Sequence, residues 1–323
     1  MTPFETASVV TTPLEAPSAA PEGGAIFKSS VLLVLELRRP GVRRTVKTAE
    51  SRYNDVGEAA KQVHVSKDIL DSKELADIEQ AHGELRRYVQ SKCLPSRFKS
   101  GTYLLPIVAI EQVDNHIQSA AQQIEEKVAA FIAAYPQRKA EALAKLTVAG
   151  LADGSDYPDP ETLRGAFDVR TAYVAFDTPS TLKTIRRDIF EREREKAAAT
   201  WANAVDEGRA LLLDTMTQLT ESMVERLTPG EDGKPKVFRD SLVTNMTEFL
   251  DTFTAKNTIT NDAELAAVVA DMRGLLTGVN PKDLRKDEAI RATVTENVQR
   301  IKDQLASMVI NKPARAYSFV GEE

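Results

Sequence analysis

The chain has 323 residues, of which 42% are hydrophobic and 28% are charged, as in a globular protein of one large domain or two ordinary ones. Its single cysteine, Cys93, excludes an intrachain disulfide and fits a reducing compartment. The N-terminus lacks the basic and then apolar layout of a secretory signal, and no apolar run approaches the roughly 20 residues of a membrane-spanning helix. We therefore expect a cytoplasmic protein that does not enter a membrane.

The net charge of −6 is distributed unevenly along the chain. Residues 28–100 contain 15 Lys and Arg against 10 Asp and Glu, whereas residues 101–323 contain 27 against 35. A basic N-terminal region joined to an acidic helical region predicts either a polyanionic partner or attraction between the two parts of the chain.

The first 27 residues are rich in Pro, Ala, Thr and Ser and offer few apolar side chains to a core, so they predict a disordered tail. Order begins with VLLV at 31–34, which is typical of a strand buried on both faces. Pro40 and Gly41 then suit the centre of a tight turn. With a returning strand after that turn, the pattern predicts a β-hairpin over 31–48.

Long helices dominate the rest of the chain. A helix is predicted over 66–92 with Ser66 as its N-cap, and a second over 110–146, which Pro136 interrupts or kinks. A third runs from about Ser180 to Leu227 and would span roughly 70 Å if unbroken. Such a length suggests a stalk or an elongated bundle.

The predicted organisation has two helical parts. TPGEDGKPK at 228–236 is a linker between a domain over 28–227, made of the β-hairpin and long helices, and a C-terminal helical lobe over 237–311. Residues 312–323 form an irregular tail. TAYVAFD at 171–177 alternates like a strand and adds to the hairpin. The predicted fold class is mainly α (α+β), an elongated helical bundle with long amphipathic helices and a small antiparallel β-sheet.

Cysteine and histidine supply little material for catalysis. Cys93 lies between Lys92 and Arg97, which would lower the pKa of an exposed thiol, but no nearby base accompanies it. The triplet at 82–84 has the H-x-E order of zinc deaminases without their paired cysteines, so we interpret His82 as a helix-surface residue.

The remaining motifs are equally weak. Four acids at 153–161 could gather a hard cation, but their spacing is not that of an EF-hand loop, and a solvated acidic loop is the favoured interpretation. GEDGKPK lacks the P-loop spacing, and no nucleophile elbow is present. We expect no catalytic residue, no metal and no cofactor.

Basic residues of the 28–100 region are the candidates for nucleic-acid binding, because guanidinium and ammonium groups contact phosphates. Tyr88, Phe98 and Tyr103 lie among them and could stack on bases. The alternative is that these side chains pair with the acidic helices of the same chain. The candidates are Arg38, Arg39, Arg43, Arg44, Arg86, Arg87, Lys92, Arg97 and Lys99.

Apolar residues on the second predicted helix and in the tail are the candidates for binding a protein partner. The helix contributes a near-heptad stripe, which would otherwise be intramolecular core or a coiled-coil seam between copies of the chain. The tail contributes two aromatic side chains. The candidates are Ile117, Ile124, Val128, Phe131, Tyr317 and Phe319.

Five stretches of the sequence resemble a protein family of tailed phages and prophages. They are SRYNDV at 51–56, YVQSKCLP at 88–95, GTYLLP at 101–106, FRDSLVTNM at 238–246 and NPKDLRKDEAIRATV at 280–294. The resemblance covers nearly all of the chain after residue 27 and implies a phage protein in the cytoplasm of a bacterial host, without supplying an active site. A weaker similarity, to a domain encoded on mobile elements beside MoxR-type AAA+ ATPases, implies an adaptor role.

These observations favour a non-enzymatic helical adaptor or scaffold that acts on a protein partner, for which the similarity suggests a AAA+ ATPase. The alternative is an accessory DNA-binding protein of phage replication or recombination that uses the basic 28–100 region.

Overall fold

The computed structural model describes residues 28–46, 66–70, 72–96, 99–148, 150–174, 184–229, 240–279, 284 and 287–310. Helices make up 74% of these residues, and four strands form an antiparallel sheet, which confirms the mainly α (α+β) fold class. None of the helices within these ranges is long and apolar enough to cross a membrane. Both predicted tails, 1–27 and 312–323, lie outside the described residues, as does most of the predicted linker.

Strand β1 (Ser30–Arg38) occupies the centre of the sheet. It pairs with β5 (Thr102–Pro106) on one edge and with β6 (Asp168–Val174) on the other, and β4 (Leu94–Pro95) completes the order β4-β5-β1-β6. Side chains alternate between the two faces of a strand. Leu32 belongs to one hydrophobic core and Leu33 to another, so the predicted burial of this strand on both faces is confirmed.

The predicted hairpin over 31–48 is wrong in its pairing. Strand β2 (Arg43–Thr45) pairs with β3 (Ser66–Asp68) in a separate two-stranded sheet. Because β5 and β6 already occupy both edges of β1, a strand returning after Pro40 and Gly41 has no edge of β1 left to join. The predicted pairing of 171–177 with β1 is confirmed for 171–174, and 175–177 lie outside the described residues.

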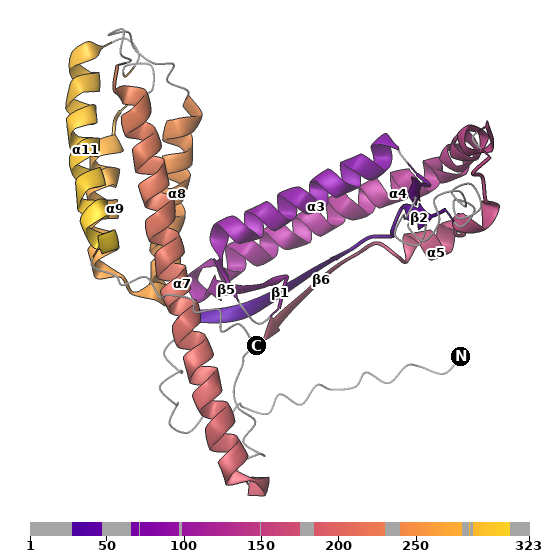
Figure 1. Cartoon of the computed structure of the whole chain (residues 1–323), viewed down its shortest axis with the longest axis horizontal. Coiled ribbons are helices and arrows are strands. Elements are labelled where there is room, and N and C mark those ends of the chain that lie inside the picture. The colour runs from indigo at the N-terminus through magenta and orange to yellow at the C-terminus, as the bar shows by residue number, and fades with distance from the viewer. Residues whose placement is uncertain are drawn as a thin grey trace, which may run out of the picture.

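Helices α3 (Lys73–Lys92) and α4 (Ile110–Val148) run side by side along one face of the sheet, as Figure 1 shows. The helix predicted from Ser66 begins later: Ser72 is its N-cap and accepts from the Leu75 amide at 3.2 Å, while 66–68 are strand β3. Pro136 lies inside α4 without ending it. We call α3, α4, α5 (Pro160–Arg164) and β2–β3 the arm.

Four helices form a bundle around the second core: α7 (Arg187–Leu227), α8 (Asp240–Thr260), α9 (Ala263–Leu276) and α11 (Glu288–Ile310). The bundle contains α7 from Trp201 onward, whereas Arg187–Thr200 has no buried residue and extends beyond the bundle (Figure 1). The sequence analysis assigned this helix to the predicted domain over 28–227. In the structure it shares one core with α8, α9 and α11, because its apolar stripe needs those helices as cover.

The arm and the bundle meet at the sheet, where two glycines allow close contacts. Gly208 of α7 faces Leu94 of β4, and a Cβ added there would lie 2.8 Å from Leu94 Cδ1. Gly101 has φ +82°, and its carbonyl accepts from the Leu35 amide at 2.8 Å. A side chain at Gly101 would combine backbone strain with a clash against the Leu35 carbonyl.

Candidate functional site

The arginines that follow β1 lie at the far end of the arm, where acids of the same chain face several of them. Arg39 forms an ion pair with Glu79 of α3, and Arg43 pairs with Asp68 of β3 at 3.2 Å. The Arg44 guanidinium donates to the Gly41 carbonyl at 2.9 Å. The acids of both ion pairs, Glu79 and Asp68, belong to the basic 28–100 region itself, so these arginines do not pair with the acidic helices of residues 101–323. Exposed pairs of this kind contribute about 0 to 1 kcal/mol each, so they weaken the case for a phosphate site without removing the charges.

The remaining candidates divide between two places. Arg86 and Arg87 are exposed on the middle of α3, and among the described residues neither forms an ion pair. Lys92 ends α3, and Lys99 lies 3.7 Å from Glu36 of β1. Arg97 lies outside the described residues. The predicted patch is therefore spread along the arm rather than gathered at a hairpin tip.

Two of the three aromatic residues predicted to stack on bases, Tyr88 and Tyr103, are engaged within the chain. Tyr88 stacks on His116 of α4 with 3.5 Å between ring centroids, and the Lys92 ammonium lies 5.7 Å from the Tyr88 ring. Tyr103 is buried in the arm core, because β5 presents it to the face covered by α3 and α4. The stacking prediction is wrong for Tyr103, and Phe98 lies outside the described residues.

The stripe predicted to bind a partner on α4 is instead the arm core. Ile117, Ile124, Val128 and Phe131 are all buried, with exposed fractions of 6% or less. They pack in one cluster with residues of α3 and of the sheet. The prediction that they form a partner surface is therefore wrong, because α3 covers the α4 stripe. Tyr317 and Phe319, the tail candidates, lie outside the described residues.

Cys93 lies at the junction of the arm and the bundle, where burial raises the pKa of its thiol to about 12. A lowered pKa was predicted only for an exposed thiol; Cys93 is buried, and its desolvation outweighs the lowering by the charge of Lys256. Lys256 of α8 lies close by, and burial together with the charge of Lys92 lowers its pKa to about 8. Nothing in the sequence distinguishes Lys256 from a surface lysine. The thiol stays protonated at neutral pH and is not a nucleophile.

His82 is not the helix-surface residue that was expected. It is 6% exposed, and its Nε2 atom has no hydrogen-bond partner among the described residues. Burial lowers its pKa, and the charges of Arg39 and Arg86 lower it further. His82 is thus a neutral histidine in the arm core near pH 7.

The acidic loop is partly structural. Asp156 forms an ion pair with Lys67 at 2.7 Å, with side-chain exposures of 18% and 10%, and the Asp153 carboxylate caps the Ser155 amide at 2.9 Å. The interpretation of this loop as fully solvated is wrong for Asp156, because β3 brings Lys67 against it. In the ranges that the structure describes, no group of three or more His, Cys, Asp or Glu could hold a metal ion.

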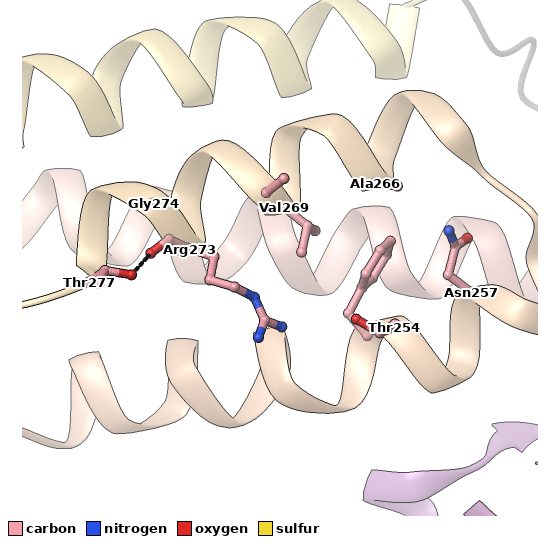
Figure 2. Close-up of a pocket in the computed structure, with 9 residues that line it drawn as sticks. Thr254, Asn257, Ala266, Val269, Arg273, Gly274 and Thr277 are labelled. Carbon is pink, nitrogen blue, oxygen red and sulfur yellow. Dashed lines mark hydrogen bonds between the residues drawn. The ribbon is translucent and has the colours of Figure 1, made fainter. Parts of the chain in front are cut away.

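An open groove between α8 and α9 is the candidate site of the bundle (Figure 2). It has a volume of about 430 Å³, with Phe253 and Val269 among its apolar residues. Small residues recur along α9 at positions four apart, and an alanine or glycine offers little obstruction to a neighbouring backbone. The small residues are Ala266, Ala270 and Gly274.

Polar groups of the groove are mostly bound within the chain. The Arg273 guanidinium, which Figure 2 shows reaching from α9 toward α8, donates to the Leu250 carbonyl and lies 3.7 Å from Asp251. The Asn257 side chain accepts from Thr260 and from the Asp262 amide, both at 2.8 Å. Such a site offers shape and apolar surface rather than a reacting group. The sequence analysis did not predict this groove, because its only signal in the sequence is a glycine inside a helical segment.

Comparison of the chain with protein-family models, with curated proteins and with solved structures gives no match.

Proposed function

We propose that the protein is a non-enzymatic adaptor that binds an amphipathic helix of a protein partner in the α8–α9 groove. The proposal rests on the presence of a glycine, Gly274, in the lining of the groove. It lies inside α9, where glycine is less favourable than alanine by about 1 kcal/mol. A Cβ added there would meet nothing within 4 Å, so packing inside the chain does not require glycine at this position. Close contact with another backbone would require it.

Charge favours a basic partner helix. Residues 240–279, which contain both helices of the groove, carry six acids and two basic residues, a net charge of −4. The lining itself has one charged residue, Arg273, which lies 3.7 Å from Asp251 of α8, and Asp271 follows Ala270 of the lining on α9. Opposite charges at the border steer association and fix the orientation of the bound helix. A AAA+ ATPase is the candidate partner that the resemblance suggests.

Site-specific photo-crosslinking in host cells tests this proposal. A photo-reactive amino acid replaces Ala270 in the groove or, as a matched control, Ala292 on the exposed side of α11. We expect one protein to be crosslinked from position 270 and not from position 292, and Gly274→Leu to abolish that product. Equal products from both positions would refute the groove as the binding site. A saturable turnover of nucleotide or polymer by the purified protein would refute the non-enzymatic assignment.

A second candidate function, DNA binding by the arm, is favoured by Arg38, Arg86 and Arg87. All three are exposed, and none forms an ion pair within the described ranges. Fluorescence anisotropy of labelled DNA at roughly 50 and 200 mM salt tests it, because phosphate contacts weaken steeply with salt. Replacement of the three arginines by Glu is expected to abolish binding. Unchanged affinity in that variant would remove the arm surface from consideration.

A further inference from the structure

Strand β6 forms one edge of the four-stranded sheet and is much longer than the other edge strand. It has seven residues, Asp168–Val174, whereas β4 has two. In Figure 1, β1 and β6 run as a ribbon from the bundle toward β2. At one end of β6, the Tyr173 hydroxyl donates to the Asp114 carboxylate of α4 at 2.6 Å. Within the part of the chain that the structure describes, no strand pairs with the outer side of β6.

One hydrogen bond of β1 determines which residues of β6 direct their backbone N–H and C=O groups outward. The Leu35 amide donates to the Gly101 carbonyl, next to β5, so Leu35 directs its N–H and C=O away from β6. Thr171 lies opposite Leu35 in the β1–β6 register. In an antiparallel pair, both members of a non-hydrogen-bonded pair direct these groups outward. Since the direction alternates along a strand, Val169, Thr171 and Tyr173 present their N–H and C=O groups at the open edge.

The edge formed by β6 has few of the sequence features that prevent pairing with another strand. Proteins usually protect long edges with prolines, bulges or several charges. Residues 169–173 contain no proline and one charged residue, Arg170, which pairs with Asp168 on the same strand. The side chains from Arg170 to Tyr173 are exposed. The edge is therefore able to accept another extended backbone along the length of three outward-facing residues.

We propose that β6 pairs with β6 of a second copy of this chain, antiparallel about a two-fold axis at Thr171. In this register the outward N–H and C=O groups of Val169, Thr171 and Tyr173 are all paired. Val169 lies opposite Tyr173 of the second copy, and Thr171 lies opposite Thr171, which are favourable cross-strand combinations. A register centred on Arg170 would place two arginines opposite each other. The dimer joins two four-stranded sheets into one and does not depend on the groove or on the proposed adaptor function.

The mass of the purified full chain in solution tests the proposal. The chain has a mass of 35.5 kDa, and sedimentation across about 1 to 100 μM is expected to show twice that mass at the upper end. Thr171→Lys and Thr171→Glu each place like charges opposite each other at the two-fold axis. We expect each to weaken dimerisation at least about tenfold, whereas Thr171→Val, the matched control, retains it.

Mixing the two charged variants distinguishes this register from any other dimer. In an equimolar mixture, the positive charge introduced by Thr171→Lys faces the negative charge introduced by Thr171→Glu across the axis, so heterodimers are expected to form. A wild-type protein that stays monomeric at every concentration would overturn the proposal. So would a dimer that the charged substitutions leave unchanged, or a mixture that stays monomeric. Circular dichroism of each variant checks that the fold is retained.

Discussion

Because Gly208 and Leu94 are in close contact, we expect Gly208→Ala to destabilise the wild-type chain but to stabilise a chain in which Leu94 is shortened. A Cβ added at Gly208 would lie 2.8 Å from Leu94 Cδ1 and 3.2 Å from Thr260 Cγ2. Leu94 is fully buried in a close-packed core, so its side chain can move away only by displacing its neighbours. Overpacking costs about 1 to 3 kcal/mol, and the better helix propensity of alanine offsets about 1 kcal/mol of this. We expect Gly208→Ala to lower the free energy of unfolding by about 1 kcal/mol.

The same substitution is expected to stabilise a protein in which Leu94 is shortened. Leu94→Ala alone costs about 2 to 5 kcal/mol, because it leaves a cavity beside Gly208. The added methyl group of Gly208→Ala then no longer meets Leu94 Cδ1, and only the contact with Thr260 Cγ2 at 3.2 Å remains. Helix propensity makes the substitution favourable by at most about 1 kcal/mol. Gly274→Ala is the matched control, since a Cβ there meets nothing within 4 Å and the same gain is expected.

Urea unfolding followed by helical circular dichroism measures these free energies. The four proteins of the Gly208 and Leu94 cycle and the Gly274→Ala control are compared at one temperature and pH. A wild-type chain that Gly208→Ala stabilises as much as Gly274→Ala does would refute the predicted clash. Equal destabilisation of both backgrounds by Gly208→Ala would refute it as well, because the cost would then not arise from Leu94.

Three further predictions concern the arm and the sheet. The pKa of His82 is lowered from its usual value near 6.5, so protonation favours the unfolded chain. The stabilisation is full above that pH and falls below it. Urea unfolding should therefore show a smaller loss of stability toward pH 5 in His82→Gln than in the wild-type chain. Gly101→Ala is expected to lower the unfolding free energy by at least about 1 kcal/mol, because φ is +82°, and an unchanged urea midpoint would contradict this. Lys67→Met leaves Asp156 as a largely buried unpaired charge and should lower the unfolding free energy by about 3 to 5 kcal/mol. Adding Asp156→Leu should recover much of this loss. Equal stability of the single and double variants would contradict the prediction.

Local patterns in the sequence determined much of the secondary structure. The spacing of apolar residues predicts a helix over 110–146, which the structure has over 110–148, because this helix must bury one stripe. The run VLLV at 31–34 predicts a strand covered on both faces, and the arm and the bundle cover it. These features depend on periodicity, which does not require knowledge of the partner element.

The partners of each element were decided by the tertiary structure. The turn at Pro40 suits a hairpin, yet β2 pairs with β3, because both edges of β1 are occupied by strands distant in sequence. The stripe containing Ile117 has the same spacing whether α3 or another protein covers it. Burial of Cys93 and Asp156 likewise depends on helices and strands far along the chain. Periodicity identifies a face that must be covered, but the covering surface follows only from how the whole chain packs.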